Sequence, residues 1–131
     1  MISLSSATRI FIVTGVTDMR KSFNGLYGIV AHQLEQDPLS GHVFVFCNRT
    51  RNRIKLLVWD GSGLWVCAKR LEEGRFHWSW DSDRAAATIS HESLSLLLGG
   101  LDLAKVKPRP WYRKNNPHEL AVPAEQIPLG R

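Results

Sequence analysis

The chain has 131 residues, 44% of them hydrophobic and 22% charged, which is ordinary for a single globular domain. Lys and Arg total 17 against 12 Asp and Glu, so the formal net charge of +5 at pH 7 favours an anionic partner, most commonly nucleic acid. The only apolar run near the N-terminus, Ile10–Val13, is too short for a signal peptide or a membrane span, and no helical segment combines a basic face with a strongly apolar one. We therefore expect a soluble, cytoplasmic protein without a membrane partner.

The first predicted elements are a strand and a helix. Thr8–Thr14 carries apolar side chains on both faces, which predicts a strand in the interior of a sheet. A long amphipathic helix is predicted from Met19 to about Gln36, with Asp18 as its N-cap and Asp37-Pro38 ending it. Its apolar face consists of residues at helical spacing: Phe23, Leu26, Tyr27, Val30 and Leu34.

Three strands then form a predicted antiparallel meander, over His42–Cys47, Arg53–Trp59 and Leu64–Leu71. Their β-branched and aromatic residues suit a pleated, half-buried surface. Between the last two strands, Asp60–Gly63 supplies glycines for a tight turn that needs positive φ.

The next run, Arg75–Trp80 (RFHWSW), is predicted to be a fifth strand because its three aromatic residues alternate with polar ones. These aromatics fit either a core face or an exposed platform on which bases stack. A short helix is predicted over Ser90–Leu98, with Ser90 as its N-cap and Gly99-Gly100 after its last turn.

These elements predict one α+β domain over residues 1–104. It would contain an antiparallel sheet of about five strands, with the long helix packed on one face and the short helix near its C-terminal end. From Lys105 onward, basic residues are interleaved with prolines and aromatics. Residues 105–131 are therefore predicted to be an extended or disordered tail, which either stays solvated or orders on nucleic acid or a protein.

The two cysteines, Cys47 and Cys67, both fall in predicted strands and neither belongs to a CxxC pair. A disulfide between neighbouring strands is one interpretation. The lack of a secretory signal favours the other, in which both thiols are reduced in the cytosol.

Basic residues crowd the connection after the second strand, and no acid occurs between Asp37 and Asp60. Like charges this close repel one another unless they are solvated or meet an anion. They fit either a solvated hairpin tip or a surface that faces phosphates. The candidate nucleic-acid-binding residues, some from the predicted helix start and third meander strand, are Arg20, Lys21, Arg49, Arg51, Arg53, Lys55, Lys69, Arg70 and Arg75.

Nothing in the sequence indicates a catalytic site. Strand transfer on two metal ions needs about three converging acids, but the acids here fall at a predicted cap, a turn and a link: Asp18, Asp60, Asp81 and Asp83. The histidines have no i, i+4 or i, i+2 spacing, and phosphate-binding glycine loops and nucleophile motifs are lacking. We therefore expect no catalytic residues, metal site or cofactor.

Several short motifs occur in a recognisable order and spacing: DMRKSFNGL (residues 18–26), SGHVFVF (40–46), Asn48-Arg49, Arg53-Ile54-Lys55, WDGSG (59–63) and KRLEEGRF (69–76). Over roughly residues 2–103 the chain closely resembles the small TnpB-type accessory proteins of the insertion sequence 66 family of bacterial elements. These are distinct from the RNA-guided nucleases that share the name TnpB. The resemblance implies a protein that assists DNA transposition beside a separate, larger transposase.

Two hypotheses about function follow. In the first, the protein is a non-catalytic accessory factor that binds DNA through the basic hairpin, with phosphates as the principal contacts. In the second, it is an assembly factor that docks on the transposase or on a second copy of itself through an aromatic patch and a sheet edge, without touching DNA.

Overall fold

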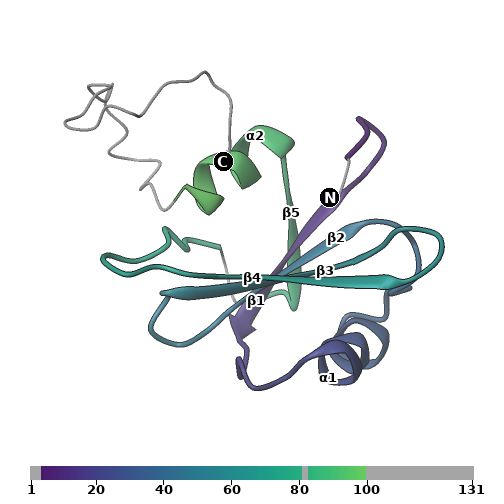
Figure 1. The fold of residues 1–131 in the computed structure, drawn as a ribbon, viewed down its shortest axis with the longest axis horizontal. Coiled ribbons are helices and arrows are strands. Elements are labelled where there is room, and N and C mark those ends of the chain that lie inside the picture. Colours follow the sequence, from purple (N-terminus) through teal and green to yellow (C-terminus); the bar gives the residue numbers. More distant parts are fainter. Residues whose placement is uncertain (1–3, 81–82, 100–131) are drawn as a thin grey trace.

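A five-stranded sheet forms the centre of the molecule, and the helical segments lie on its two opposite faces (Figure 1). The structure is a computed structural model that describes residues 4–80 and 83–99. The order across the sheet is β4-β3-β2-β1-β5. The strands are β1 (Ile10–Val16), β2 (Val43–Cys47), β3 (Arg53–Trp59), β4 (Leu64–Arg70) and β5 (Ala86–Ile89). An α+β fold was predicted, and this part of the prediction is confirmed.

The sequence had predicted a wholly antiparallel sheet, and this part of the prediction is wrong because the sheet is mixed. β1 and β2 pair in parallel, with Ile10 opposite Val43 and Phe11 opposite Phe44. The reason is the helix between them, which carries the chain back to the same end of the sheet before β2 begins. The remaining neighbours, β2–β3, β3–β4 and β1–β5, are antiparallel, so the predicted meander is confirmed.

The predicted helix from Met19 to Gln36 is wrong in length. The helical segment covers only eleven residues, as α1 (Phe23–Gly28) and a continuing π-helical turn, η1 (Ile29–Gln33). Ser22, not Asp18, is the N-cap residue. The Asp18 carboxylate instead accepts a hydrogen bond from the Arg20 backbone N–H at 2.9 Å, which folds this segment into a turn.

The helical segment also ends earlier than predicted. The Leu34 N–H bonds to the Ile29 carbonyl at 3.0 Å, the wider i to i+5 spacing of a π turn. Glu35 then adopts φ 55°, which stops the helix before Asp37-Pro38.

The predicted strand at Arg75–Trp80 is also wrong, because this run is not part of the sheet. The Phe76 N–H bonds to the Arg51 carbonyl at 2.7 Å, and Phe76 is buried while Trp78 and Trp80 pack beside it. The three aromatics therefore belong to the core, which was one of the two interpretations, and cover a sheet face. The fifth strand is β5, which begins in the last two residues of a run predicted only as a link and continues over two residues for which no element was predicted.

The last helix is confirmed. α2 (His91–Leu98) begins after Ser90, whose Oγ accepts a hydrogen bond from the Ser93 N–H at 3.0 Å. Residues 105–131, the predicted tail, lie outside the described residues, as do residues 81–82 of the predicted link over residues 81–87.

Alternation along the strands divides the core in two. On the α2 face, Ile12, Val45 and Ile54 pack with Leu94 and Leu97 of α2. On the other face, the α1 face, the buried residues are Val13, Leu26, Ile29, Val30, Phe44, Phe46 and Leu57. β1 and β2 are apolar on both sides because both of their faces are covered, as predicted for β1.

The turn between β3 and β4 depends on one carboxylate. Asp60 accepts hydrogen bonds from the backbone N–H groups of Ser62 and Gly63, both at 2.9 Å, and from the Trp65 indole N–H at 2.7 Å. Gly61, at φ 103°, permits the turn. These bonds, the Ser62 backbone bond first, lower the pKa of Asp60 from an ordinary 3.8 to about 2.

We predict that Asp60 makes stability depend on pH in the acid range. Because its folded-state pKa is the lower one, the folded state binds fewer protons, so its contribution is present above pH 3.8 and is lost as the pH falls through about 2. Urea unfolding of the parent and of Asp60→Asn should show a stability difference near neutral pH that shrinks across this window. A difference that stays constant with pH would contradict the assignment.

Candidate functional site

The parallel pairing of β1 and β2 brings two connections together at one end of the sheet. Val16 lies opposite Cys47, and the Thr17 N–H bonds to the Cys47 carbonyl at 2.9 Å. The β1–α1 connection (residues 17–22) and the β2–β3 hairpin tip (residues 48–52) therefore start side by side. Each carries basic residues, although 25 residues separate the two segments in the sequence.

Asn48 gives the hairpin tip a fixed shape. Its Oδ1 accepts the backbone N–H groups of Asn52 and Arg53, both at 3.1 Å, and its Nδ2 donates to Asn52 Oδ1 at 2.8 Å. Thr50 Oγ1 also donates to Asn52 Oδ1 at 2.9 Å. The tip is thus ordered by the side chains of Asn48, Thr50 and Asn52, and the side chains of Arg49 and Arg53 are exposed.

Arg51, between these two exposed arginines, is placed differently. It has φ 61°, an uncommon conformation for an arginine, and its guanidinium carbon lies 5.4 Å from the centre of the Trp78 ring. Burial raises the pKa of the Cys47 thiol, and the neighbouring Arg51 opposes this rise. Arg51 therefore holds the 75–80 segment against the α2 face, with its guanidinium turned to the interior.

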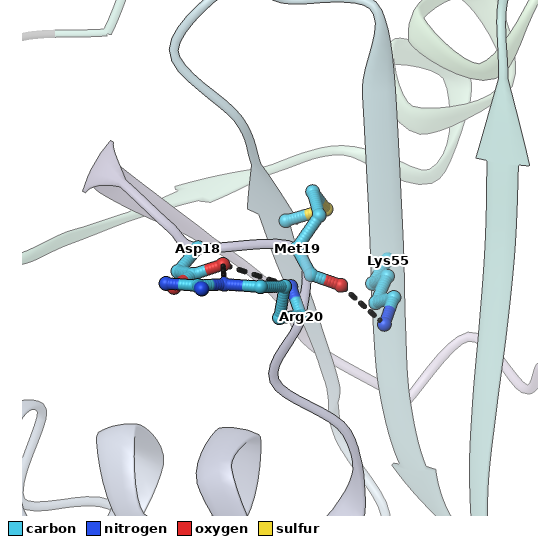
Figure 2. A network of polar contacts seen from close by, with 4 residues as sticks. All are labelled: Asp18, Met19, Arg20 and Lys55. Atoms are coloured by element: carbon cyan, nitrogen blue, oxygen red, sulfur yellow. Dashed lines mark hydrogen bonds and ion pairs between the residues drawn. The ribbon is translucent and has the colours of Figure 1, made fainter.

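Lys55 is also used inside the protein. Its Nζ donates to the backbone carbonyls of Met19 at 2.9 Å and Lys21 at 2.8 Å. Figure 2 shows the Lys55 side chain reaching from β3 to the Met19 carbonyl in the β1–α1 connection. An ammonium that bonds to two carbonyls ties this connection to the sheet.

Arg20 is exposed but paired with Asp18. The closest contact joins Arg20 Nη2 to Asp18 Oδ2 at 2.7 Å, and the Arg20 side chain is 91% exposed (Figure 2). Hydrogen bonds from Arg20 lower the pKa of Asp18 to about 2. Separating the two side chains costs little free energy because both are solvated, so Arg20 remains available to a stronger anion.

The register of β3 and β4 separates the remaining basic residues by face. Arg53 lies directly opposite Arg70, and both side chains are on the α1 face with Lys55. Lys69 lies opposite Ile54 on the α2 face, where its Nζ donates to the Leu98 carbonyl at the end of α2. Two like charges directly opposite one another repel, which disfavours the Arg53–Arg70 arrangement unless an anion lies nearby.

Two open hollows adjoin on this surface. The first, of about 450 Å³, lies between the β1–α1 connection and the hairpin tip, and the second, of about 460 Å³, lies over the paired ends of β3 and β4. They share Met19 and Arg53. Six basic residues and two acidic ones line them: Arg20, Arg49, Arg53, Lys55, Lys69 and Arg70, with Asp18 and Glu72. Both acids are already paired, Asp18 with Arg20 and Glu72 with Arg70. We call the surface around the two hollows the basic groove.

The structure therefore brings together part of the predicted set. Arg49 and Arg53 lie in the basic groove without an ion pair among residues 4–80 and 83–99. The Arg51 side chain points to the α2 face. Arg75 lies in the exposed turn that follows β4 and leads to the α2 face. The Lys21 side chain is exposed. It lies beside the groove, because the Lys21 carbonyl accepts a hydrogen bond from Lys55.

Sequence reasoning missed the polar residues that shape the groove. Asn48 was named only within a family motif, and Asp18 was taken for a helix cap, although an Asp two residues before Arg is also typical of a local ion pair. Among the described residues, no group of three or more His, Cys, Asp or Glu is arranged to hold a metal ion. Within the same residues both cysteines are free, and no helix is long and apolar enough to cross a membrane.

We predict that Lys55 stabilises the fold, whereas Lys21 does not. Lys55→Met would leave two carbonyls without their charged donor, a loss of about 1–2 kcal/mol of unfolding free energy. Lys21→Met removes the same charge from an exposed side chain and should cost less than about 0.5 kcal/mol. Urea unfolding of both variants measures the difference, and equal stabilities would argue against the Lys55 assignment.

Comparisons with known proteins agree on one family. A family model described as "IS66 Orf2 like protein" matches residues 8–108. The uncharacterized proteins y4jC and y4hO of Sinorhizobium fredii are each 39% identical to the chain, over 113 and 102 residues respectively. The first alignment covers 86% of this chain and 96% of the relative, the second 78% and 88%. No solved structure matches significantly. The chain therefore belongs to the IS66 Orf2-like family, the TnpB-type proteins of insertion sequence 66 elements, and this membership indicates an accessory role in transposition.

Proposed function

We propose that the protein is a non-catalytic accessory factor of transposition that binds DNA through the basic groove. The observation that carries the proposal is the charge distribution around the two hollows, where six basic residues meet only two acidic ones. Phosphate oxygens are the partner that such a surface fits, because several cations held close together gain most from a polyanion.

Arg49 and Arg53 would be the principal contacts. Both are exposed, both line the first hollow, and the Asn48 hydrogen bonds to the Asn52 and Arg53 N–H groups hold the backbone of the tip in place. A fixed backbone reduces the entropy lost on binding, and guanidinium groups bind phosphate in a bidentate manner. Arg20 and Arg70 would exchange weak, solvated ion pairs with Asp18 and Glu72 for phosphate contacts.

Arg51, Lys55 and Lys69 would take a smaller part than the sequence predicted. Arg51 lies against Trp78, Lys55 binds two backbone carbonyls, and Lys69 binds the last turn of α2. Their charges add to the local potential, but their side chains are committed to the fold. Since the proposed contacts between the groove and DNA are all to phosphate, the binding would tolerate many DNA sequences.

The alternative function, docking on the transposase, has one observation in its favour. Phe23 and Tyr27 lie one turn apart on α1, with 47% and 37% of their surfaces exposed. An exposed aromatic pair on a helix is typical of a protein contact. In this alternative the basic groove would bind acidic residues of the transposase in place of phosphates.

We predict that Arg49→Ala combined with Arg53→Ala weakens DNA binding to a similar extent for all duplex sequences. Each phosphate contact that is lost should reduce the slope of log K against log salt by about 0.9, so the double variant should lose roughly two slope units. A fluorescence-anisotropy titration across a salt series, with element-end DNA and an unrelated duplex, measures both effects.

The matched control is Arg9→Ala combined with Arg84→Ala. It removes the same formal charge from two exposed arginines that line neither hollow of the groove. It should keep the parent salt slope. If both double variants weaken binding equally, net charge and not the groove is responsible. If the groove variant binds DNA as the parent does but no longer associates with the transposase, the alternative function is correct.

We also predict that the purified protein does not cleave DNA in the presence of Mg²⁺. Asp60 carries a carboxylate, the group that a metal-dependent nuclease uses, but two backbone N–H groups and the Trp65 indole already bind it. Incubation of supercoiled plasmid with protein and Mg²⁺ should leave it intact. Magnesium-dependent nicking that is lost in Asp60→Ala, while circular dichroism shows an intact fold, would overturn the non-catalytic assignment.

A further inference from the structure

The outer edge of β4 presents backbone groups that have no partner among residues 4–80 and 83–99. β4 is at one end of the sheet and pairs only with β3 among the described strands. The Leu71 N–H bonds to Asn52 and the Asp60 N–H bonds to Gly63, which fixes the alternation of the β3–β4 ladder. Odd-numbered residues of β4 direct their N–H and C=O groups at β3. The even-numbered residues therefore direct their N–H and C=O groups outward, away from β3: Leu64, Val66, Ala68 and Arg70.

We propose that this edge pairs with the β4 edge of a second copy of the chain, antiparallel and centred on Cys67. Hydrogen bonds across the edge must join outward-directed residues of both copies. With Cys67 opposite its own counterpart, Leu64 pairs with Arg70 and Val66 pairs with Ala68. All four outward residues of each strand are then used, so the whole of β4 is self-complementary.

The charges on β4 select the antiparallel orientation. Its two basic residues, Lys69 and Arg70, are adjacent at the C-terminal end, whereas Asp60 precedes the N-terminal end. A parallel arrangement would place four cations side by side, which is unfavourable. The antiparallel arrangement separates the two cationic ends and brings each one toward the Asp60 turn of the other copy.

Trp65 provides the apolar contact at this edge. It is 42% exposed, and its indole N–H is held by Asp60, so little side-chain freedom remains to be lost. In the proposed register it lies directly opposite Lys69 of the second copy, on the α2 face. Because the Lys69 ammonium is held by the Leu98 carbonyl, Trp65 would pack on the apolar stem of this lysine, and an ordered, exposed Trp is the kind of residue that dominates small interfaces.

The small residues at the centre of the strand allow the close approach. Cys67 and Ala68 offer no bulk, and the two Cys67 residues form a non-hydrogen-bonded pair, for which the Cα atoms are about 4.5 Å apart. In such a dimer the α1 faces of both copies lie on the same side of the joined sheet, because paired residues share a face. Two basic grooves would then be presented together.

Cysteine cross-linking tests the register directly. Burial raises the pKa of the Cys67 thiol, so copper–phenanthroline and not air is the suitable oxidant. It should convert the full-length parent into a disulfide-linked dimer, because Cα atoms about 4.5 Å apart suit a disulfide. Cys67→Ser should abolish the product, since Cys47 is buried. Cysteine moved by one position, in Cys67→Ser combined with Ala68→Cys, should cross-link far less, and efficient cross-linking there would refute the register.

The oligomeric state tests the edge independently of the thiols. Sedimentation should show a dimer of the parent, weakened on the order of tenfold or more by Trp65→Ala. Ala68→Pro removes an outward N–H without removing a β3–β4 bond and should give a folded monomer, whereas Ala68→Val keeps this N–H and the dimer. A parent that stays monomeric at about 100 µM, or a dimer untouched by Trp65→Ala and not cross-linked at Cys67, would overturn the proposal. Neither experiment contains DNA, so failure here leaves the proposed DNA binding standing.

Discussion

The parallel pairing of β1 with β2 is the constraint on which the rest of the structure depends. Parallel strands end at the same side of a sheet, so the segment after β1 and the hairpin after β2 must meet. Their meeting creates the first hollow, which both Arg20 and Arg49 line. Without the short α1–η1 crossover, these arginines would lie at opposite ends of the sheet, and the basic groove would not exist.

Concentrating cations at one place requires internal partners for some of them. Lys55 and Lys69 bind backbone carbonyls, Arg51 lies over Trp78, and Arg20 and Arg70 have carboxylate partners. Each interaction offsets repulsion that would otherwise oppose folding. Arg49 and Arg53 are left exposed to solvent, and they are the residues at which an added anion gains most. The same charges that hold the fold together also set the potential of its surface.

The strong and weak points of sequence reasoning follow from the range of the interactions involved. Local patterns predicted the β2–β3–β4 meander, the Asp60 turn and the Ser90 cap, because neighbouring residues alone decide them. The direction of β2 relative to β1 and the choice of β5 over Arg75–Trp80 depend on distant partners. Alternating aromatics suit a strand, but Phe76 is buried on the α2 face and its N–H bonds to the distant Arg51 carbonyl instead of joining the sheet.

The amino-acid sequence by itself determined the family, the α+β class, the basic character and the cluster of arginines around the hairpin tip. Only the tertiary structure decided which of those arginines are available. Arg49, Arg51 and Arg53 alternate in the sequence and look equivalent there. The positive φ of Arg51 and the packing of Trp78 direct one inward, while the Asn48 hydrogen bonds leave the other two outside. Side-chain direction at a turn is set by backbone conformation and by partners distant in sequence, and residue type alone does not contain that information.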